Sequence, residues 1–228
     1  MSKTKMRAVL IREYGGPNVM KLEEIDRPVP SAGEVLVKIH YATFIPLDWK
    51  IRNGWVQNVF PKTFPYIPGF YASGVIESIG PGVTEFHIGD RVFGMVDSAY
   101  AEYGIASAGK PADTPNAEYA AAPVDALVKM PDGLSFEEAA TIRAGAETAW
   151  KALFTEGELR AGQTVLIHAA AGGVGQFAVQ LAKWKGAHVI GTCSTANLDF
   201  VKSLGADQVI DYTTTAFEDV VKEVDLVV

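Results

Sequence analysis

The chain has 228 residues, of which 48% are hydrophobic and 21% charged, and this composition excludes an intrinsically disordered protein. The net charge of −7, without any basic stripe, argues against a nucleic-acid partner. The single cysteine, Cys193, rules out a disulfide framework within the chain, and neither a signal peptide nor a membrane-spanning apolar run is visible, so we expect a cytoplasmic protein with no membrane partner.

Residues 1–125 are predicted to form a β-rich domain. Strands are expected at residues 6–11, 21–25, 34–41 and 74–80, with a further strand after the turn at 86–94. In the strand at 34–41 one face carries the side chains of Val35, Val37, Ile39 and Tyr41, which is typical of a half-buried strand. A helical turn is expected at 48–52 and an inserted loop at 97–114. Pieces of this length and spacing predict a small barrel or sandwich.

Residues 126–228 are predicted to form a second domain, in which helices and strands alternate. Ser135 and Glu138 have the spacing of a capping box, which begins a helical stretch that reaches about residue 154. Strands are then expected at residues 164–168, 188–192, 208–211 and 224–228, separated by helices at 176–185, 197–204 and 217–222. This alternation is typical of an α/β fold with a parallel sheet.

A glycine-rich turn joins the strand at 164–168 to the helix at 176–185. Gly172, Gly173, Val174 and Gly175 belong to an A-x-G-x-x-G pattern, in which Ala170 replaces the usual first glycine. Strand, turn and helix in this order bind the pyrophosphate of a dinucleotide, because free N–H groups and the positive end of the helix dipole meet there. A side chain at Gly172 or Gly175 would block that approach or hold the helix off the strand. A tight turn in an unrelated α/β protein is the alternative interpretation.

The end of the second strand of this unit indicates which dinucleotide binds. NAD-binding folds place an acidic residue about 20 residues past the glycines, where it bonds the ribose 2′-hydroxyl. This chain has Ser194, Thr195 and Asn197 in that stretch and no acid before Asp199, so NADP(H) is favoured as the cofactor. Tyr212, just after the third strand, is a candidate contact for a phosphate or the adenine, and its alternative role is to cover the end of the sheet.

The last predicted strand, at 224–228, would be the fourth of a doubly wound fold whose strand order is 3-2-1-4-5-6. It would form an open apolar edge, which is an aggregation hazard. We therefore expect the nucleotide-binding domain to be truncated after strand four, either because the chain is a fragment of a longer protein or because a partner covers this edge.

Several motifs follow one another along the chain. They are the stretches 46–54 (PLDWKIRNG), 67–69 (IPG), 89–94 (GDRVFG), 145–150 (GAETAW) and 169–175 (AAAGGVG). With these motifs the chain resembles the medium-chain dehydrogenase/reductase superfamily, and within it the zinc-independent, NADPH-dependent quinone oxidoreductase-like branch. The resemblance covers essentially the whole chain.

The resemblance implies a GroES-like β-rich catalytic domain followed by a Rossmann domain, with the active site in the cleft between them. It also implies hydride transfer from NADPH to a quinone or an α,β-unsaturated carbonyl. Ile45, Pro46 and Thr148 match family positions at the cofactor, although relatives commonly carry Asn where this chain has Ile45. Tyr71 and Lys50 are the candidates for proton donation or oxyanion bonding; Tyr71 as core filler and Lys50 as a solvated side chain are the alternatives.

Zinc-dependent relatives carry a cysteine after the third strand and a Gly-His-Glu motif. This chain has Gly69, Phe70 and Tyr71 at that motif, and its only cysteine lies in the second domain, so we expect no metal site. Two alternatives to a reductase are a non-catalytic NADPH-binding regulator and an inactive fragment of such a reductase. The resemblance implies a homodimer or homotetramer, since relatives often assemble in these forms.

Overall fold

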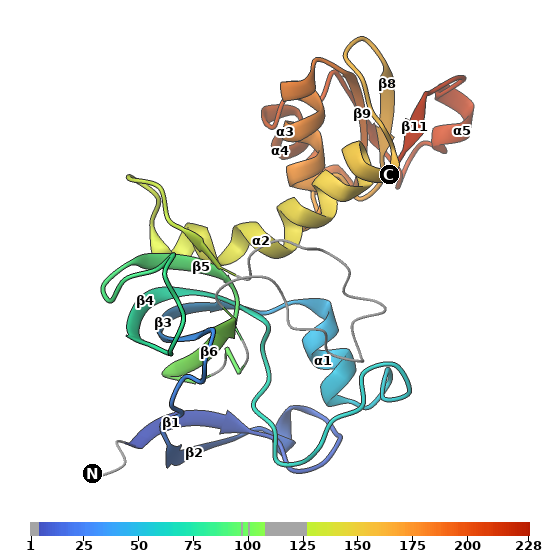
Figure 1. Cartoon of the computed structure of the whole chain (residues 1–228). Helices are drawn as coiled ribbons and strands as arrows, with labels where there is room; N and C mark the ends of the chain where they lie inside the picture. Colours follow the sequence, from blue (N-terminus) through green and yellow to red (C-terminus); the bar gives the residue numbers. More distant parts are fainter. Residues whose placement is uncertain (1–4, 97, 100, 108–126) are drawn as a thin grey trace. The chain divides into compact units, whose positions relative to one another are not determined.

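The computed structural model describes residues 5–96, 98–99, 101–107 and 127–228 (Figure 1). The chain divides into two compact units, Met1–Arg143 and Ala144–Val228. The domain boundary expected between residues 125 and 126 lies outside the described residues and stays a prediction. Within the described part, no helix is both long and apolar enough to cross a bilayer.

The first unit is mainly antiparallel β-structure. In chain order it contains β1 (Lys5–Leu10), β2 (Lys21–Asp26), β3 (Glu34–Thr43), α1 (Pro46–Arg52), β4 (Tyr71–Ile79), β5 (Arg91–Met95), β6 (Tyr103–Ser107), β7 (Leu127–Lys129) and the start of α2 (Phe136–Trp150). Five strands form one sheet in the order β6-β3-β4-β5-β7, and β1 pairs with β2 as a separate hairpin.

The core of this sheet follows the predicted alternation in β3 only in part. Val35 and Val37 are fully buried, and Ile39 packs against the same cluster. Tyr41 is 48% exposed, so its predicted place on the buried face is wrong. The pairing of β3 with β4 shifts register between Ile39 and Tyr41, and a shift of this kind moves later side chains to the other face.

β6 lies inside the stretch 97–114, which the sequence predicts as a loop. It pairs antiparallel with β3, where Ala106 lies opposite Val35 and Gly104 opposite Val37. The loop prediction is therefore wrong for residues 103–107, while residues 97, 100 and 108–114 lie outside the described residues. The strand was missed because its stability comes from a partner about seventy residues earlier and not from a local pattern.

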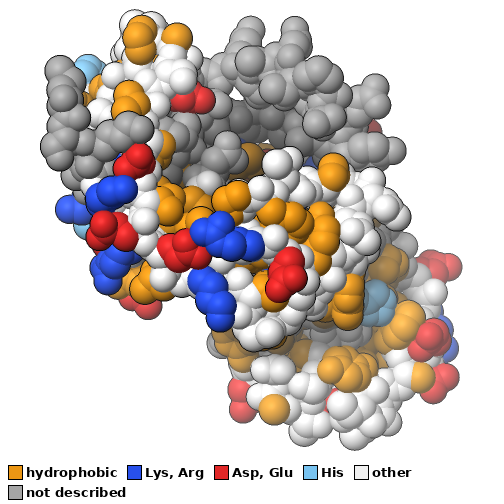
Figure 2. Space-filling model, turned by 90° about the horizontal axis from the view of Figure 1, so that it is seen from below, with side chains coloured by type: hydrophobic (Ala, Val, Ile, Leu, Met, Phe, Trp, Pro, Cys, Tyr) orange, Lys and Arg blue, Asp and Glu red, His pale blue; other side chains and the backbone are white. Residues whose placement is uncertain are grey.

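Opposite charges are paired on the β1–β2 hairpin. The Nζ atom of Lys5 lies 2.8 Å from Asp26, and the guanidinium of Arg12 lies 2.6 Å from Glu23. Figure 2, which views this side of the molecule, shows basic and acidic side chains lying close together with apolar side chains between them. Exposed pairs add little stability because water screens them, but they keep this face free of a single-sign field.

The helix α2 begins at the predicted capping box. The hydroxyl of Ser135 accepts the N–H of Glu138 at 3.2 Å, and the Glu138 carboxylate accepts the N–H of Ser135 at 3.0 Å. The hydrogen bond from the Ser135 hydroxyl, followed by that from its N–H, lowers the pKa of Glu138 below its ordinary value. Past Trp150 the chain continues as a π-helical stretch, Lys151–Glu156, close to the predicted end of the helical region.

The second unit is a parallel sheet with helices. It contains β8 (Thr164–Ile167), α3 (Gly175–Lys185), β9 (His188–Cys193), α4 (Leu198–Ser203), β10 (Gln208–Asp211), α5 (Phe217–Val220) and β11 (Leu226–Val227). The strand order β10-β9-β8-β11, with every pair parallel, is the predicted order 3-2-1-4 of a Rossmann-type fold. The small buried face of α3 packs on this sheet through Ala178, Val179 and Ala182.

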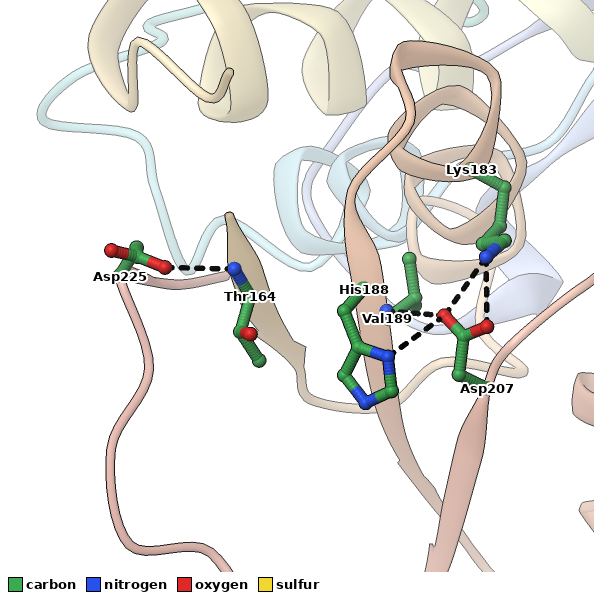
Figure 3. Close-up of polar contacts among 6 residues, drawn as sticks. All are labelled: Thr164, Lys183, His188, Val189, Asp207 and Asp225. Carbon is green, nitrogen blue, oxygen red and sulfur yellow. Dashed lines mark hydrogen bonds and ion pairs between the residues drawn. The ribbon is translucent and has the colours of Figure 1, made fainter. Parts of the chain in front are cut away.

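Two carboxylates hold the starts of the parallel strands together (Figure 3). Asp207 accepts hydrogen bonds from the Nζ atom of Lys183 at 2.8 and 2.9 Å and from the N–H of Val189 at 2.7 Å. Burial alone would raise the pKa of Asp207, but the hydrogen bonds from Lys183 and Val189 outweigh it and hold this pKa below its ordinary value. Asp225 accepts the N–H of Thr164 at 2.8 Å in the same manner.

We expect Asp207→Asn to lower the free energy of unfolding at pH 7 by about 1 to 2 kcal/mol, because a charged acceptor is lost from a partly exposed network. The ordinary pKa of 3.8 exceeds that of the folded state, so this stabilisation is present above about pH 4 and is lost as the pH falls below it. Denaturant titrations of both proteins from pH 7 downward measure this difference. The exposed Asp199→Asn is the control, and a difference for Asp207→Asn that persists undiminished at about pH 2 would contradict the assignment.

Candidate functional site

The glycine turn predicted from the sequence lies between the end of β8 and the start of α3. Ala169 adopts a left-handed backbone conformation (φ 49°), and its carbonyl accepts the N–H of Gly172 at 2.8 Å. The N–H of Ala170 donates to the carbonyl of Thr192 at 2.9 Å, so the turn is tied to the end of β9. These bonds fix the turn at the carboxyl ends of two adjacent parallel strands, which is where open α/β sheets bind ligands.

Three consecutive backbone donors are left over at this turn. The N–H groups of Gly173, Val174 and Gly175 make no hydrogen bond to any residue that the structure describes. They lie at the first turn of α3, which is 11 residues long and directs the positive end of its dipole toward them. This arrangement fits an anionic group such as a pyrophosphate.

The three glycines of the turn have different surroundings. A Cβ atom at Gly175 would lie 2.3 Å from the carbonyl oxygen of Ala169 and 2.7 Å from the Cα of Ala170, so this glycine permits close packing of α3 on the strand. A Cβ at Gly172 would lie 3.0 Å from the same oxygen. A Cβ at Gly173 would meet nothing within 4 Å among the described residues. A side chain at Gly173 would therefore extend into open space beside the free N–H groups, while the predicted role of Gly172 stays a prediction.

The motif at 145–150 contributes the helix α2 to this region. A Cβ at Gly145 would lie 2.2 Å from the carbonyl oxygen of Gly173 and 2.7 Å from the ring of Phe177, so only glycine allows this approach of α2 to the turn. Thr148 follows one turn later on the same helix and is exposed. Its hydroxyl donates to the carbonyl of Ala144 at 2.8 Å, which leaves the oxygen lone pairs of Thr148 to act as an acceptor.

The predicted ribose loop follows β9. The side-chain amide of Asn197 donates to the hydroxyl oxygen of Ser194 at 3.0 Å, and the N–H of Asn197 donates to the Ser194 carbonyl at 2.9 Å. Thr195 is exposed, and its hydroxyl donates to the carboxylate of Asp211 at 2.5 Å. The N–H of Tyr212 donates to the carbonyl of Cys193 at 3.1 Å, and the residue is 59% exposed. The structure thus brings together all four predicted residues of this loop region.

Asp211 is a residue of this region that the sequence reasoning missed. In the parallel register it lies opposite Cys193, the last residue of β9, although 18 residues separate the two in the chain. An acid is therefore present beside Thr195 even though none precedes Asp199 in the sequence after β9. The strand order 3-2-1 of a doubly wound fold was the signal that could have found it, because it places the end of the third strand next to the end of the second.

In the first unit, α1 carries the predicted residues around the Pro-x-Asp motif. Asp48 accepts the N–H of Ile45 at 2.7 Å, which fixes the start of the helix at Pro46. Lys50 is exposed, and its Nζ atom lies 5.9 Å from the ring centroid of Trp49. Tyr71, the other proposed catalytic residue, is the half-buried first residue of β4.

A pocket of about 420 Å³ opens in the same unit, within the range of roughly 300–1,000 Å³ that small-molecule sites occupy. Its walls come from α1, from the proline-rich segment before β4 and from the segment after β5. The lining residues are Asp48, Ile51, Lys62, Pro65, Tyr66, Ile67, Pro68, Gly69, Phe70 and Ser98. Neither Lys50 nor Tyr71 is among them.

Tyr66 lines the pocket, and its hydroxyl is buried and has no hydrogen-bond partner among the described residues. Burial, together with the nearby Tyr14, raises the pKa of Tyr66 to about 12, so this hydroxyl keeps its proton at neutral pH. Lys62 lies beside it, with Nζ 5.6 Å from the Tyr66 ring centroid and 5.4 Å from that of Phe70. The pocket wall therefore combines a protonated tyrosine, whose buried hydroxyl has no partner among the described residues, with the cation of Lys62.

Comparisons with known proteins agree with both units. The family model of the alcohol dehydrogenase GroES-like domain matches residues 31–132, and that of the zinc-binding dehydrogenases matches residues 173–226. The structure of the quinone oxidoreductase from Coxiella burnetii is similar with a TM-score of 0.85 at 35% identity, over 99% of this chain and 68% of that one. The chain belongs to the medium-chain dehydrogenase/reductase superfamily, in its quinone oxidoreductase-like branch.

Other members of this superfamily are similar over nearly the same region. A chloroplastic quinone-oxidoreductase homolog of Spinacia oleracea is 38% identical over 220 residues, which are 94% of this chain and 63% of that protein. A mycobacterial protein whose structure was solved with NADPH is 33% identical with a TM-score of 0.76, over 93% of this chain and 60% of that one. The chain thus spans less than two thirds of the length of these relatives.

The glycine geometry gives a paired prediction. We expect Gly173→Val to weaken dinucleotide binding roughly tenfold or more without loss of stability, because its side chain would enter the open approach to the free N–H groups. We expect Gly175→Val to lower the free energy of unfolding by about 1 to 3 kcal/mol, because it forces α3 off β8. Fluorescence titrations measure the affinity and denaturant melts measure the stability. An unchanged affinity in Gly173→Val would disprove that the N–H groups of Gly173, Val174 and Gly175 bind the dinucleotide.

Proposed function

We propose that this chain carries the nucleotide and acceptor sites of a reductase that transfers hydride from NADPH to a quinone or an α,β-unsaturated carbonyl. The observation that supports this most strongly is the set of free N–H groups of Gly173, Val174 and Gly175 at the start of α3. Membership of the quinone oxidoreductase-like branch supports the reaction class, and the relative solved with NADPH supports the cofactor.

The residues of the second unit fit a bound dinucleotide. The free N–H groups of the turn would hold the pyrophosphate, and Ser194, Asn197 and Tyr212 would surround the 2′ side of the adenosine. Thr148 would present its hydroxyl oxygen as an acceptor beside the turn. When bound, NADPH supplies a hydride, which carries the two electrons that reduce the acceptor.

The pocket of the first unit supports an acceptor that carries a carbonyl oxygen. Negative charge develops on that oxygen as the hydride adds, and a proton must reach it to complete the reduction. The Tyr66 hydroxyl would donate a hydrogen bond to the charged oxygen, and the ammonium of Lys62 would stabilise the same charge. Asp48 and Ile51 of α1 line the pocket, and the family positions at the cofactor, Ile45 and Pro46, are the N-cap and the first residue of this helix.

We also propose that the reaction proceeds without zinc. The Gly-His-Glu motif of zinc-dependent relatives is replaced by Gly69, Phe70 and Tyr71, and Cys193, the only cysteine of the chain, lies in the second unit. Quinones and enones accept hydride by conjugate addition, so hydrogen bonds from Tyr66 and Lys62 suffice where a simple ketone would need a Lewis acid. A cytoplasmic location and a homodimeric or homotetrameric state stay predictions.

The test combines binding with turnover. We expect this chain to bind NADPH more tightly than NADH in fluorescence titrations, and to oxidise NADPH when 1,4-benzoquinone is added, as measured by the loss of absorbance of the reduced nicotinamide. Binding of NADPH without any turnover would favour the non-catalytic regulator or the inactive fragment. Binding of neither nucleotide would overturn the proposed function.

Variants of the pocket test the acceptor site. We expect Tyr66→Phe to lower kcat/KM for the quinone roughly tenfold to a hundredfold, because a donor to the developing charge is lost, while the Kd for NADPH stays unchanged. Lys62→Met is expected to act in the same direction. Tyr41→Phe, which changes an exposed tyrosine of the same unit, is the control.

The same assay on Tyr71→Phe and Lys50→Met tests the two residues that the family resemblance proposed. A large loss of turnover in these variants with none in Tyr66→Phe would return the catalytic role to Tyr71 or Lys50.

A further inference from the structure

Hydroxyl side chains lie in the segments after β9 and β10, and they fall into two groups by the acceptor to which each hydroxyl donates its proton. Thr195 donates to one oxygen of Asp211 at 2.5 Å, and Thr213 donates to the other oxygen at 2.6 Å. The two threonine hydroxyls lie 3.1 Å from each other, which is longer than either contact with the carboxylate. Both protons are therefore directed to Asp211, and both threonines present only lone pairs to a ligand.

The carboxylate of Asp211 is well supplied with donors. It also accepts the N–H of Thr213 at 2.9 Å. The hydrogen bond from Thr195, followed by those from Thr213, lowers the pKa of Asp211, so it carries its charge at neutral pH. An ionised carboxylate cannot donate, which fixes the direction of the hydrogen bonds from Thr195 and Thr213.

Ser194 differs from the two threonines. Its hydroxyl oxygen already accepts the side-chain amide of Asn197 at 3.0 Å, and its proton has no acceptor among the residues that the structure describes. Ser194 is half-buried and directly follows β9, where doubly wound folds place the ribose of the nucleotide. It is the hydroxyl of this loop that can donate to the 2′ group.

The charge around this loop is negative. No lysine or arginine occurs in the stretches 186–201 and 203–221, which include both loops at the ends of β9 and β10. Lys202, between these stretches, belongs to the last turn of α4. A 2′-phosphate bound beside Thr195 would thus face the Asp211 carboxylate with little cationic compensation.

We propose that Asp211 is a specificity-determining residue of the nucleotide site, which turns the protons of Thr195 and Thr213 away from the ligand, leaves Ser194 as the donor to the 2′ group and limits the preference for a 2′-phosphate. This inference rests on the proposed function, because it concerns the binding of NADPH and NADH. It assigns to one acid, at the end of β10, the role that the usual fingerprint gives to an acid at the end of β9.

The experiment measures the Kd values of NADPH and NADH by fluorescence titration for this chain and for Asp211→Asn. We expect the ratio Kd(NADH)/Kd(NADPH) to rise roughly threefold to tenfold in Asp211→Asn, because a like charge near the phosphate is removed. Asp199→Asn is the matched control, since it removes the same charge from an exposed site on α4 and is expected to leave the ratio within about twofold. A ratio that is unchanged in Asp211→Asn, or changed equally in both variants, overturns the inference.

A second pair of variants tests the direction of the hydroxyls. Ser194→Ala is expected to weaken NADPH binding roughly fivefold or more, and the isosteric Thr195→Val to change it less than about twofold, because only Ser194 has a proton to donate. Equal losses in the two variants overturn the assignment of the hydroxyls.

Salt dependence tests the charge effect on the unmodified chain, so the inference stays falsifiable if Asp211→Asn does not fold. We expect the preference for NADPH to rise between about 20 mM and about 500 mM NaCl, because salt screens the repulsion from Asp211. A preference that falls with salt indicates a cationic phosphate site and overturns the inference. If the unmodified chain binds neither nucleotide, the proposed function itself fails, which is a different result from binding with an unchanged ratio.

Discussion

The closeness of α3 to the end of β8 is the constraint on which the nucleotide unit depends. Gly175 has no room for a Cβ atom against Ala169 and Ala170, so any side chain there would push the helix away from the strand. With the helix in place, the N–H groups of Gly173 and its neighbours converge at the carboxyl end of the sheet. Gly145 also permits a close approach that a side chain would prevent, since it brings α2 against the carbonyl of Gly173. Phosphate recognition by backbone alone requires this packing, because no charged side chain has to take part.

Two aspartates at the two ends of β10 perform different tasks with the same chemical group. Asp207, before the strand, accepts from Lys183 and from the N–H of Val189, and so it ties α3 and β9 to the sheet at the edge away from the ligand-binding ends. Asp211, at the end of the strand, accepts from hydroxyls that face the ribose loop. The first carboxylate is compensated by a cation, whereas the second is compensated by neutral donors and keeps a negative field beside Thr195.

The irregular segment before β4 supplies the polar side chains Tyr66 and Lys62 that line the pocket of the first unit. Prolines at 61, 65 and 68 prevent regular structure there, so the chain can wrap around α1 and leave a pocket. Tyr66 lines that pocket with its hydroxyl buried, and Lys62 is held over two aromatic faces.

The sequence by itself determined the β8–turn–α3 unit, the capping box at Ser135, the β-rich and α/β halves and the family. Each of these depends on a local pattern or on the order of motifs, which a linear sequence carries completely. Tertiary structure alone decided that Asp211 lies beside Thr195, that residues 103–107 form a strand on β3 and that Tyr66 and Lys62 share one pocket. The first two features arise from the pairing of strands whose residues are far apart in the chain, and the third from the packing of an irregular segment against α1, so none of them leaves a periodic signal in the residues concerned.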